Sequence, residues 1–378
     1  MATPPLRIGI DGEALRVPLS GIGRYVYSLC RELEQILPSA HFFAYSRLPA
    51  DRLELPSPRW TLRCEDNPSL RRLPSFVWLK SRGRALCERD RLDFFWANRT
   101  LHPRLGGAVR TVCTVHDLNH LLVPETMQAP TLWSHRLWFE RDLALADDVV
   151  ANSCGTAERV RTLLRKPVRD IVPPGLDPSY CAHQYEPNQA VQRELAARGV
   201  VPPYLLSVAT HEPRKNIRAL VEAFVQLKRE ARLPGYRLAL VGAAGWKNRA
   251  LSRLLREAAS EGVVTTGYLP AQLLPALYAG AEAFVFPSLY EGFGMPVLEA
   301  RACGTRVLVS DSPELREAAG PHATFVDPSP SGIRAGILQT LSTPRNQENE
   351  LCQHYSWQRS AARLARIFAQ TQEAGSNP

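Results

Sequence analysis

Short apolar runs alternate along the chain with longer segments of helical periodicity. Runs of Val, Leu, Ile, Phe and Ala predict strands at 6–10, 42–45, 94–97, 109–115, 149–152, 171–177, 204–208, 237–241, 263–268, 283–286 and 306–310. Apolar residues every three or four positions predict helices at 23–37, 133–145, 217–227, 273–279, 297–303 and 355–369. Strands without regular polar alternation are typical of parallel sheets buried on both faces. The pattern therefore predicts an α/β fold with parallel sheets.

The alternation is interrupted once, by a polar segment at 178–203 that contains four prolines. Such a segment between two periodic regions is typical of a linker between domains. A chain of 378 residues is long enough for two ordinary domains. We therefore expect one α/β domain at 1–180 and a second at 181–354, followed by a terminal helix at 355–370.

The composition is that of a soluble globular protein, with 45% hydrophobic and 22% charged residues. No apolar run approaches the roughly 18 residues of a membrane helix, and the first residues lack the pattern of a secretory signal. The eight cysteines are scattered without a close pair. We expect them to be reduced, in a cytoplasmic protein.

The net charge of +9 is concentrated in basic residues between Arg59 and Arg110. No nucleic-acid-binding module is recognisable there, so we expect no nucleic-acid partner. Two interpretations remain open. The basic residues form a solvated surface, or, together with Phe76 and Trp78, they contact an anionic membrane from the cytoplasmic side.

The most informative stretch is residues 290–304, YEGFGMPVLEARACG. It follows the strand at 283–286, and its glycines allow backbone to approach a ligand closely. Pro296 suits the first position of a helix, so a helix N-terminus is expected at this sheet edge, where it can bind a phosphate. Glu291 and Glu299, the latter expected in the first helical turn, suit sugar or ribose hydroxyls. The alternative is a simple loop-to-helix turn in which Glu299 interacts with the helix dipole.

Further candidates stand at the ends of other predicted strands. Gly21 and Gly23 form a glycine-rich loop before the first helix, which either covers a diphosphate or is an ordinary turn; it lacks the third glycine of a dinucleotide fingerprint. His116 ends the strand at 109–115, the edge at which α/β proteins bind ligands, unless it is a buried structural histidine. The adjacent pair Arg214 and Lys215 suits a diphosphate or is a surface pair.

The motif E-G-F-G-x-P-x-x-E-A-x-A-x-G resembles the signature of retaining glycosyltransferase family 4, whose members have the two-domain GT-B fold and use nucleotide sugars. The resemblance extends to GIGRY at 21–25, VHDL at 115–118 and EPRKN at 212–216. It implies two Rossmann-like domains with parallel sheets facing a central cleft, and a C-terminal helix that crosses back to the first domain. One departure is Ala209, where many members have an arginine six residues before the lysine, so Arg214 is expected to replace it.

The resemblance also implies roles for individual residues. It assigns catalysis to His116, Glu291, Lys215 and Arg214. It assigns donor binding to Gly21, Gly23, Gly292, Phe293, Gly294, Met295, Pro296, Val297, Glu299 and Thr265, with Glu291 at the donor sugar, Glu299 at the ribose and Thr265 near the nucleobase. Acceptor binding extends to Asn152 and Ser153. Neither an Asp-x-Asp motif nor a histidine-carboxylate cluster at metal spacing is present, so no metal and no further cofactor are expected.

Among family 4 enzymes, the motifs resemble bacterial mannosyl- and rhamnosyltransferases that build lipopolysaccharide O-antigen. The expected donor is a GDP-linked mannose or 6-deoxyhexose, and the expected acceptor is a lipid-linked oligosaccharide at the inner membrane. Because no nucleophile pair is visible, front-face transfer with retention is favoured. A UDP-sugar enzyme, an epimerase or phosphorylase of the same fold, and a non-catalytic binding protein remain alternatives.

Overall fold

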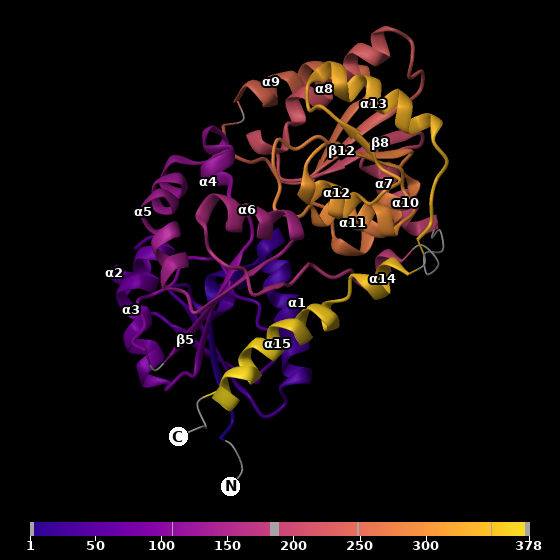
Figure 1. The fold of residues 1–378 in the computed structure, drawn as a ribbon. Helices are drawn as coiled ribbons and strands as arrows, with labels where there is room; N and C mark the ends of the chain where they lie inside the picture. Colours follow the sequence, from indigo (N-terminus) through magenta and orange to yellow (C-terminus); the bar gives the residue numbers. More distant parts are fainter. Residues whose placement is uncertain (1–3, 108, 182–188, 248, 349, 375–378) are drawn as a thin grey trace. The chain divides into compact units, whose positions relative to one another are not determined.

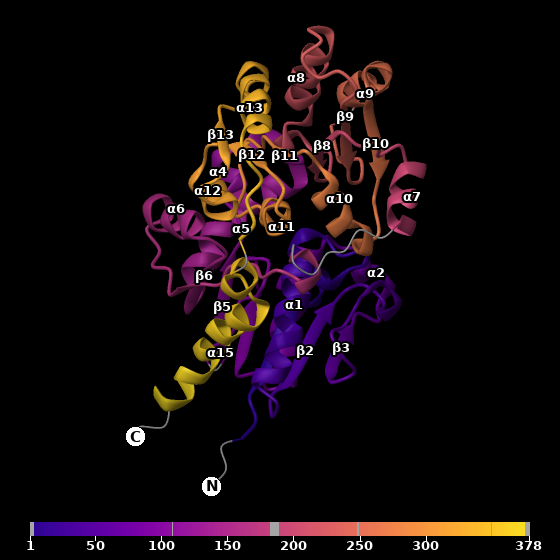
Figure 2. The same cartoon turned by 90° about the vertical axis from the view of Figure 1, so that its right-hand side faces the viewer.

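The computed structural model describes residues 4–107, 109–181, 189–247, 249–348 and 350–374. The chain divides into two compact units (Figures 1 and 2). The first unit comprises Met1–Leu118, Pro130–Gly175 and Tyr355–Pro378, and the second comprises Asn119–Ala129 and Leu176–His354.

The first unit is built on a seven-stranded parallel sheet with the order β3-β2-β1-β4-β5-β6-β7. The strands are β1 (Arg7–Asp11), β2 (His41–Ser46), β3 (Trp60–Cys64), β4 (Phe94–Ala97), β5 (Arg110–Val115), β6 (Asp148–Ala151) and β7 (Asp170–Ile171). The helices are α1 (Gly21–Ile36), α2 (Pro68–Arg71), α3 (Ser75–Arg89), α5 (Ala129–Leu145), α6 (Cys154–Leu164) and α15 (Trp357–Ala374). In Figure 1, α1 and α15 lie on one side of β5, and α3 and α5 lie on the other.

The terminal helix α15 packs beside α1, as expected for the GT-B fold. Val26, Leu29 and Leu33 on α1 are fully buried at helical spacing, and Leu364 and Phe368 on α15 join the same core. Burying large apolar side chains contributes roughly 1.5–3 kcal/mol each, so this contact fixes α15 to the first unit.

The second unit is built on a six-stranded parallel sheet with the order β10-β9-β8-β11-β12-β13. The strands are β8 (Tyr204–Val208), β9 (Arg237–Val241), β10 (Val263–Gly267), β11 (Ala283–Phe286), β12 (Val307–Ser310) and β13 (Thr324–Val326). The helices are α4 (Asn119–Leu122), α7 (Gln189–Ala197), α8 (Ile217–Arg229), α9 (Arg249–Ala258), α10 (Leu274–Gly280), α11 (Met295–Ala302), α12 (Pro313–Ala319), α13 (Pro330–Ser342) and α14 (Leu351–His354). In Figure 1, α8, α9 and α13 cover one face of the sheet, and α10, α11 and α12 cover the other.

Several local expectations differ from the structure. Gly21 and Gly23 lie in the first turn of α1, because Ser20 caps that helix by accepting from the Gly23 N–H. Glu299 lies in the second turn of α11, since the helix begins at Met295 and not at Pro296. The segment expected as a linker at 178–203 contains α7.

Residues 119–129 group with the second unit, whereas the expected domain boundary places them in the first. The indole of Trp246 donates to the Thr126 carbonyl at 2.8 Å, and the Lys247 ammonium donates to the Glu125 carbonyl at 2.7 Å. Both donors follow β9, so this short segment is attached to the second sheet by two long-range hydrogen bonds.

Candidate active site

The centre of the candidate site in the second unit is an ion cluster around Glu291. Glu291 follows β11, and its carboxylate is almost completely buried. Its Oε1 lies 2.5 Å from Lys215 Nζ, and its Oε2 lies 2.7 Å from Arg214 Nη1. Both cations come from the short 3-10 turn η6 (Pro213–Lys215) after β8. Since β8 and β11 are neighbours in the sheet, their carboxyl ends bring these three residues together.

Arg214 is also held by Glu212 and by the backbone of Tyr290. Its Nη2 lies 2.7 Å from Glu212 Oε1, and its Nη1 donates to the Tyr290 carbonyl at 2.9 Å. Glu212 stands inside the EPRKN motif but was not among the residues expected at the site. A guanidinium fixed by a carboxylate and a carbonyl keeps a defined orientation, which suits recognition of a phosphate oxygen.

Burial and mutual charge shift the pKa values of this cluster. Burial lowers the pKa of Lys215, as does neighbouring Arg214, while Glu291 opposes the shift. Burial alone would raise the pKa of Glu291, but the charges of Arg214 and Lys215 prevail and lower it to about 2. The carboxylate is therefore ionised at neutral pH and has lone pairs left to accept from hydroxyl groups.

The N-terminus of α11 follows the cluster directly. Gly294 caps the helix with φ of +101°, and an added Cβ would lie 2.9 Å from the Leu315 side chain, so glycine is required there. The first turn of a helix presents N–H groups and a positive dipole end, a suitable site for phosphate.

The other motif residues divide by burial. Phe293 and Val297 are buried core side chains, whereas Met295 and Pro296 are half-buried and Gly292 is buried. Glu299 is also buried, and its carboxylate accepts a hydrogen bond from Tyr278, a residue that the sequence analysis missed. Thr265 lies on β10 with an exposed side chain, opposite Leu240 of β9.

In the first unit, His116 follows β5 and is buried. Its Nε2 lies 2.7 Å from the Asn98 carbonyl, which can only accept, so Nε2 carries the hydrogen. Burial lowers the pKa of His116 below its usual value, against the opposing effects of this hydrogen bond and of Asp117. The Tyr25 ring stands edge-on to the imidazole at 5.0 Å, and its hydroxyl donates to the Val172 carbonyl. Tyr25 belongs to the quoted GIGRY motif, but only the folded chain places it against His116.

Asn152 and Ser153 stand at the end of β6, next to β5. Because Val115 pairs with Ala151, the two residues that follow, His116 and Asn152, are neighbours at this sheet edge. The Ser153 hydroxyl accepts from the Thr156 N–H and so caps α6. Gly23 also has a packing role, because an added Cβ would lie 2.6 Å from the Ala14 carbonyl oxygen.

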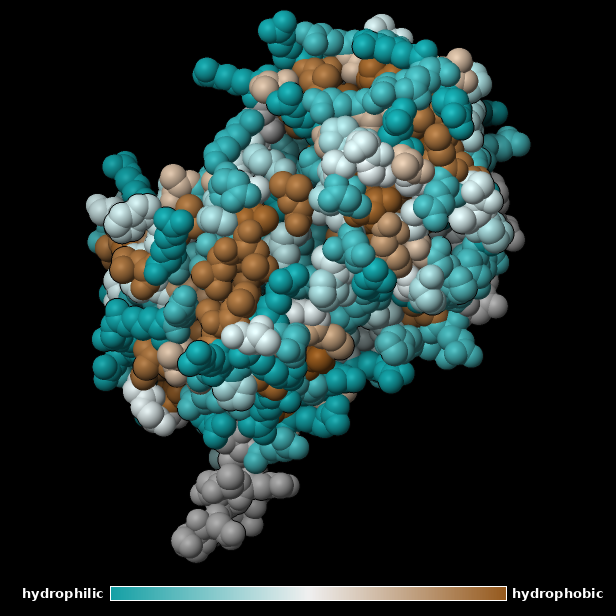
Figure 3. Space-filling model, turned by 45° about the horizontal axis from the view of Figure 1, so that its top comes forward, coloured by the Kyte–Doolittle hydropathy of each residue, from teal (hydrophilic) through white to brown (hydrophobic). Residues whose placement is uncertain are grey.

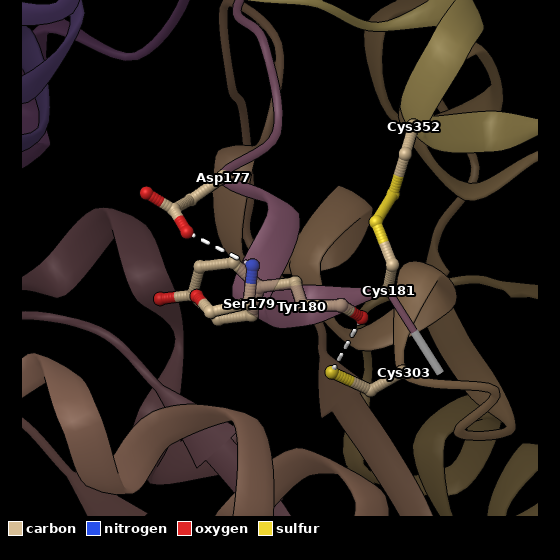
Figure 4. The surroundings of a disulfide bond; sticks show 6 residues. All are labelled: Asp177, Ser179, Tyr180, Cys181, Cys303 and Cys352. Carbon is tan, nitrogen blue, oxygen red and sulfur yellow. Dashed lines mark hydrogen bonds between the residues drawn. A yellow bond between two sulfur atoms is a disulfide. The ribbon is translucent and has the colours of Figure 1, made fainter. Parts of the chain in front are cut away.

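The expectation that all cysteines are reduced is wrong for one pair. Cys181 and Cys352 form a disulfide within the second unit, with Cα atoms 6.5 Å apart (Figure 4). Because the two cysteines are 171 residues apart, their spacing in the sequence does not indicate that they pair. The bond joins the segment that enters this unit to the segment that leaves it.

The structure does not support a membrane contact through Trp78, one of the two aromatic residues on which the membrane interpretation rested. Trp78 on α3 is fully buried, and its indole donates to Glu65. Lys80, another member of the basic segment, is paired with Asp142. Three exposed apolar residues of this unit gather on α5 instead, where Trp133, Leu137 and Leu145 are 71%, 51% and 52% exposed. Figure 3 shows apolar side chains at the surface on the side where Figure 1 labels α5.

Within the described residues, no group of three or more His, Cys, Asp or Glu side chains is arranged to hold a metal ion. Nor does any described helix have the length and apolar character needed to cross a membrane.

Comparisons with known proteins agree with this architecture. Residues 19–180 match the model of Glycosyltransferase Family 4, and residues 192–357 match that of Glycosyl transferases group 1. Among solved structures, sucrose-phosphate synthase of Thermosynechococcus elongatus superposes with a TM-score of 0.76 at 21% identity, covering 98% of this chain and all of that one. WaaG, a glycosyltransferase involved in lipopolysaccharide biosynthesis, superposes with a TM-score of 0.66 at 16% identity, covering 96% and 95%. The fold is therefore GT-B.

A curated relative is similar over nearly the whole chain. The O-antigen chain mannosyltransferase B of Escherichia coli is 31% identical over 358 residues, which cover 89% of this chain and 91% of the relative. The protein belongs to the group 1 glycosyltransferases with a family 4 N-terminal domain, and it is a glycosyltransferase.

Proposed function

We propose that the protein transfers a hexose, mannose or a 6-deoxyhexose such as rhamnose, from a GDP-sugar to a growing lipid-linked polysaccharide such as O-antigen, with retention of configuration. The observation that carries this proposal is the cluster of Lys215, Arg214 and Glu291 beside the N-terminus of α11. The choice of mannose and of a polysaccharide acceptor is supported by the printed function of the Escherichia coli relative.

The second unit holds the donor through three kinds of group. Lys215 and Arg214 stabilise the diphosphate through their positive charges. The α11 N-terminus adds the backbone N–H groups of Gly294 and Met295 as donors. Glu291 accepts from the sugar hydroxyls and Glu299 from the ribose, while Thr265 lies near the nucleobase.

The reaction proceeds on one face of the sugar. The acceptor hydroxyl oxygen forms a bond to the anomeric carbon as the bond from that carbon to the phosphate oxygen breaks, and the acceptor proton passes to the departing phosphate. Lys215, Arg214 and the helix N-terminus stabilise the negative charge that develops on the diphosphate, which supports transfer without a metal ion. We assign His116 to contact with the donor sugar and Asn152 to contact with the acceptor.

A peripheral membrane contact is proposed on α5. Trp133, Leu137 and Leu145 lie four and eight positions apart, so they share one face of the helix, and the exposed basic residues Arg136 and Arg141 accompany them. An exposed tryptophan and leucines beside arginines suit the interface of an anionic bilayer on the cytoplasmic side. This surface replaces the one that Phe76 and Trp78 suggested.

The donor is tested by thermal shift with GDP, UDP, ADP and their sugar conjugates, with and without EDTA. The proposal predicts stabilisation by GDP species that EDTA does not change. Stabilisation by UDP species alone would discard the GDP-sugar assignment. Incubation of GDP-mannose with lipid-linked oligosaccharides, followed by NMR of the product's anomeric proton, then tests transfer and retention; release of free sugar without extension would contradict the transferase assignment.

A further inference from the structure

The Tyr278 side chain lies against Glu299 in the interior of the second unit. Tyr278 is on α10, it is fully buried, and its hydroxyl donates to Glu299 Oε2 at 2.9 Å. Glu299 is on α11 and is also buried. The hydrogen bond joins the neighbouring helices α10 and α11, and Tyr278 is not one of the groups proposed to contact the donor.

The phenol has little freedom to leave this position. The backbone carbonyl of Tyr278 accepts from the Thr305 hydroxyl at 2.6 Å. The tyrosine ring is edge-on to Phe284 at 5.5 Å and to Tyr180 at 6.0 Å. A side chain packed on two sides by aromatic rings keeps one rotamer, so its hydroxyl remains directed at Glu299.

Tyr180 is itself fixed by its neighbours. It precedes Cys181, whose disulfide to Cys352 anchors this end of the segment (Figure 4). Its carbonyl accepts from the Cys303 thiol, which follows the last residue of α11. Tyr180, which packs on the Tyr278 ring, is therefore itself held by a residue at the C-terminal end of α11, the helix that carries Glu299.

We infer that Tyr278 is a positioning residue, which holds the Glu299 carboxylate so that it accepts hydrogen bonds from the vicinal hydroxyls of a nucleotide ribose. This inference rests on the proposed function, because that proposal places the ribose at Glu299. A carboxylate can accept from several donors, and a hydrogen bond to one of its oxygens restrains the orientation of the whole carboxylate group. Groups that contact a ligand need such support to keep their geometry within a fraction of an ångström.

A different reason for the same hydrogen bond is that any buried carboxylate needs a partner. The two reasons predict different results. If the phenol only satisfies a buried charge, its removal lowers stability and weakens every nucleotide equally. If it positions the carboxylate for ribose, its removal weakens only those nucleotides that have both hydroxyls.

The test compares Y278F with Y204F by calorimetric titration of GDP, 2′-deoxy-GDP and 3′-deoxy-GDP. Tyr204 is a matched control, because it is buried and its hydroxyl donates to the Leu277 carbonyl, one residue before Tyr278. A hydrogen bond to a charged group corresponds to about tenfold or more in affinity. We expect Y278F to lose about tenfold for GDP and little for the deoxy analogues, and Y204F to keep the wild-type ratios.

A second variant separates positioning from folding. In an E299Q background, the additional Y278F change should leave GDP affinity unaltered, because the oriented carboxylate is already gone. Equal losses for GDP and both deoxy analogues, or wild-type affinities in Y278F, would overturn the inference while leaving donor binding intact. Wild-type protein that binds none of the nucleotides would instead overturn the proposed function, and the inference with it.

Discussion

Lys215 Nζ lies 2.5 Å from Glu291 Oε1, although the two residues are 76 positions apart in the chain. The pair also includes Arg214, whose Nη1 lies 2.7 Å from the other oxygen of the same carboxylate. A nearly buried carboxylate between two cations holds both cations in position, and they hold the carboxylate in position in turn. In the proposed function, Glu291 therefore orients the two cations that bind phosphate and also accepts hydrogen bonds from sugar hydroxyls.

The first prediction concerns Glu291. Its replacement by alanine removes a hydroxyl acceptor and leaves Lys215 and Arg214 without their shared partner. Because the proposed contact strengthens in the transition state, E291A should lower kcat by about 10²-fold or more, with a smaller change in KM. Steady-state kinetics with a saturating donor measures this, and E222A, which changes a carboxylate on the solvent-facing side of α8, is the control. An E291A enzyme with wild-type kcat and a raised KM would refute the assignment.

The second prediction is a pH dependence of stability. The folded-state pKa of Glu291, about 2, is below its ordinary value of 4.5, so its contribution is present above pH 4.5 and is lost as the pH falls towards 2. Urea unfolding between pH 5 and pH 2 should show wild-type stability falling more steeply than that of E291Q. Parallel curves for the two proteins over this window would contradict the cluster's electrostatics.

A third prediction follows from the hydrogen bond of His116. Burial lowers its pKa, so the ring should be neutral at pH 7 with its hydrogen on Nε2. Nitrogen-detected NMR of labelled protein, with H116N to assign the signal, should give a titration midpoint below 6.5 and a protonated Nε2. A midpoint at or above 6.5 would mean that the histidine is charged or exposed.

The fourth prediction concerns the disulfide. Its two cysteines are 171 residues apart, and cross-links that close long loops typically contribute about 2–4 kcal/mol. C352S should lower the free energy of unfolding by about this amount, and a thiol reductant should destabilise the wild type but not the variant. C154S is the matched control, because Cys154 is exposed and forms no disulfide. If labelling of the unfolded, unreduced protein finds all eight thiols free, the disulfide is absent.

The fifth prediction tests the α5 surface. The double variant W133A/L137A should lower co-sedimentation with vesicles that contain phosphatidylglycerol, because it removes two exposed apolar side chains from one helix face. L163A is the control, since Leu163 on α6 has a similar exposure of 50%. Unchanged sedimentation of the double variant would remove α5 from the membrane proposal.

The sequence predicts the sheets better than the contacts between distant side chains. Buried parallel strands such as residues 283–286 are uninterrupted apolar runs and could be located directly. The edge strand β3 was missed, because an edge strand has polar positions among its apolar ones. The motifs indicate Glu291 and Lys215, but nothing local in the sequence indicates that the Tyr25 ring lies edge-on to His116 or that Tyr278 donates a hydrogen bond to Glu299.

We propose that the Lys215–Glu291 cluster binds the diphosphate of a nucleotide sugar. Calorimetric titration of GDP-mannose into the wild type and K215M, in buffer with EDTA, tests it most directly. We expect measurable binding by the wild type and an affinity at least about tenfold lower in K215M, because a buried charge-assisted contact is lost. Equal affinity in the two proteins, or no binding of GDP-mannose by the folded wild type, would contradict it.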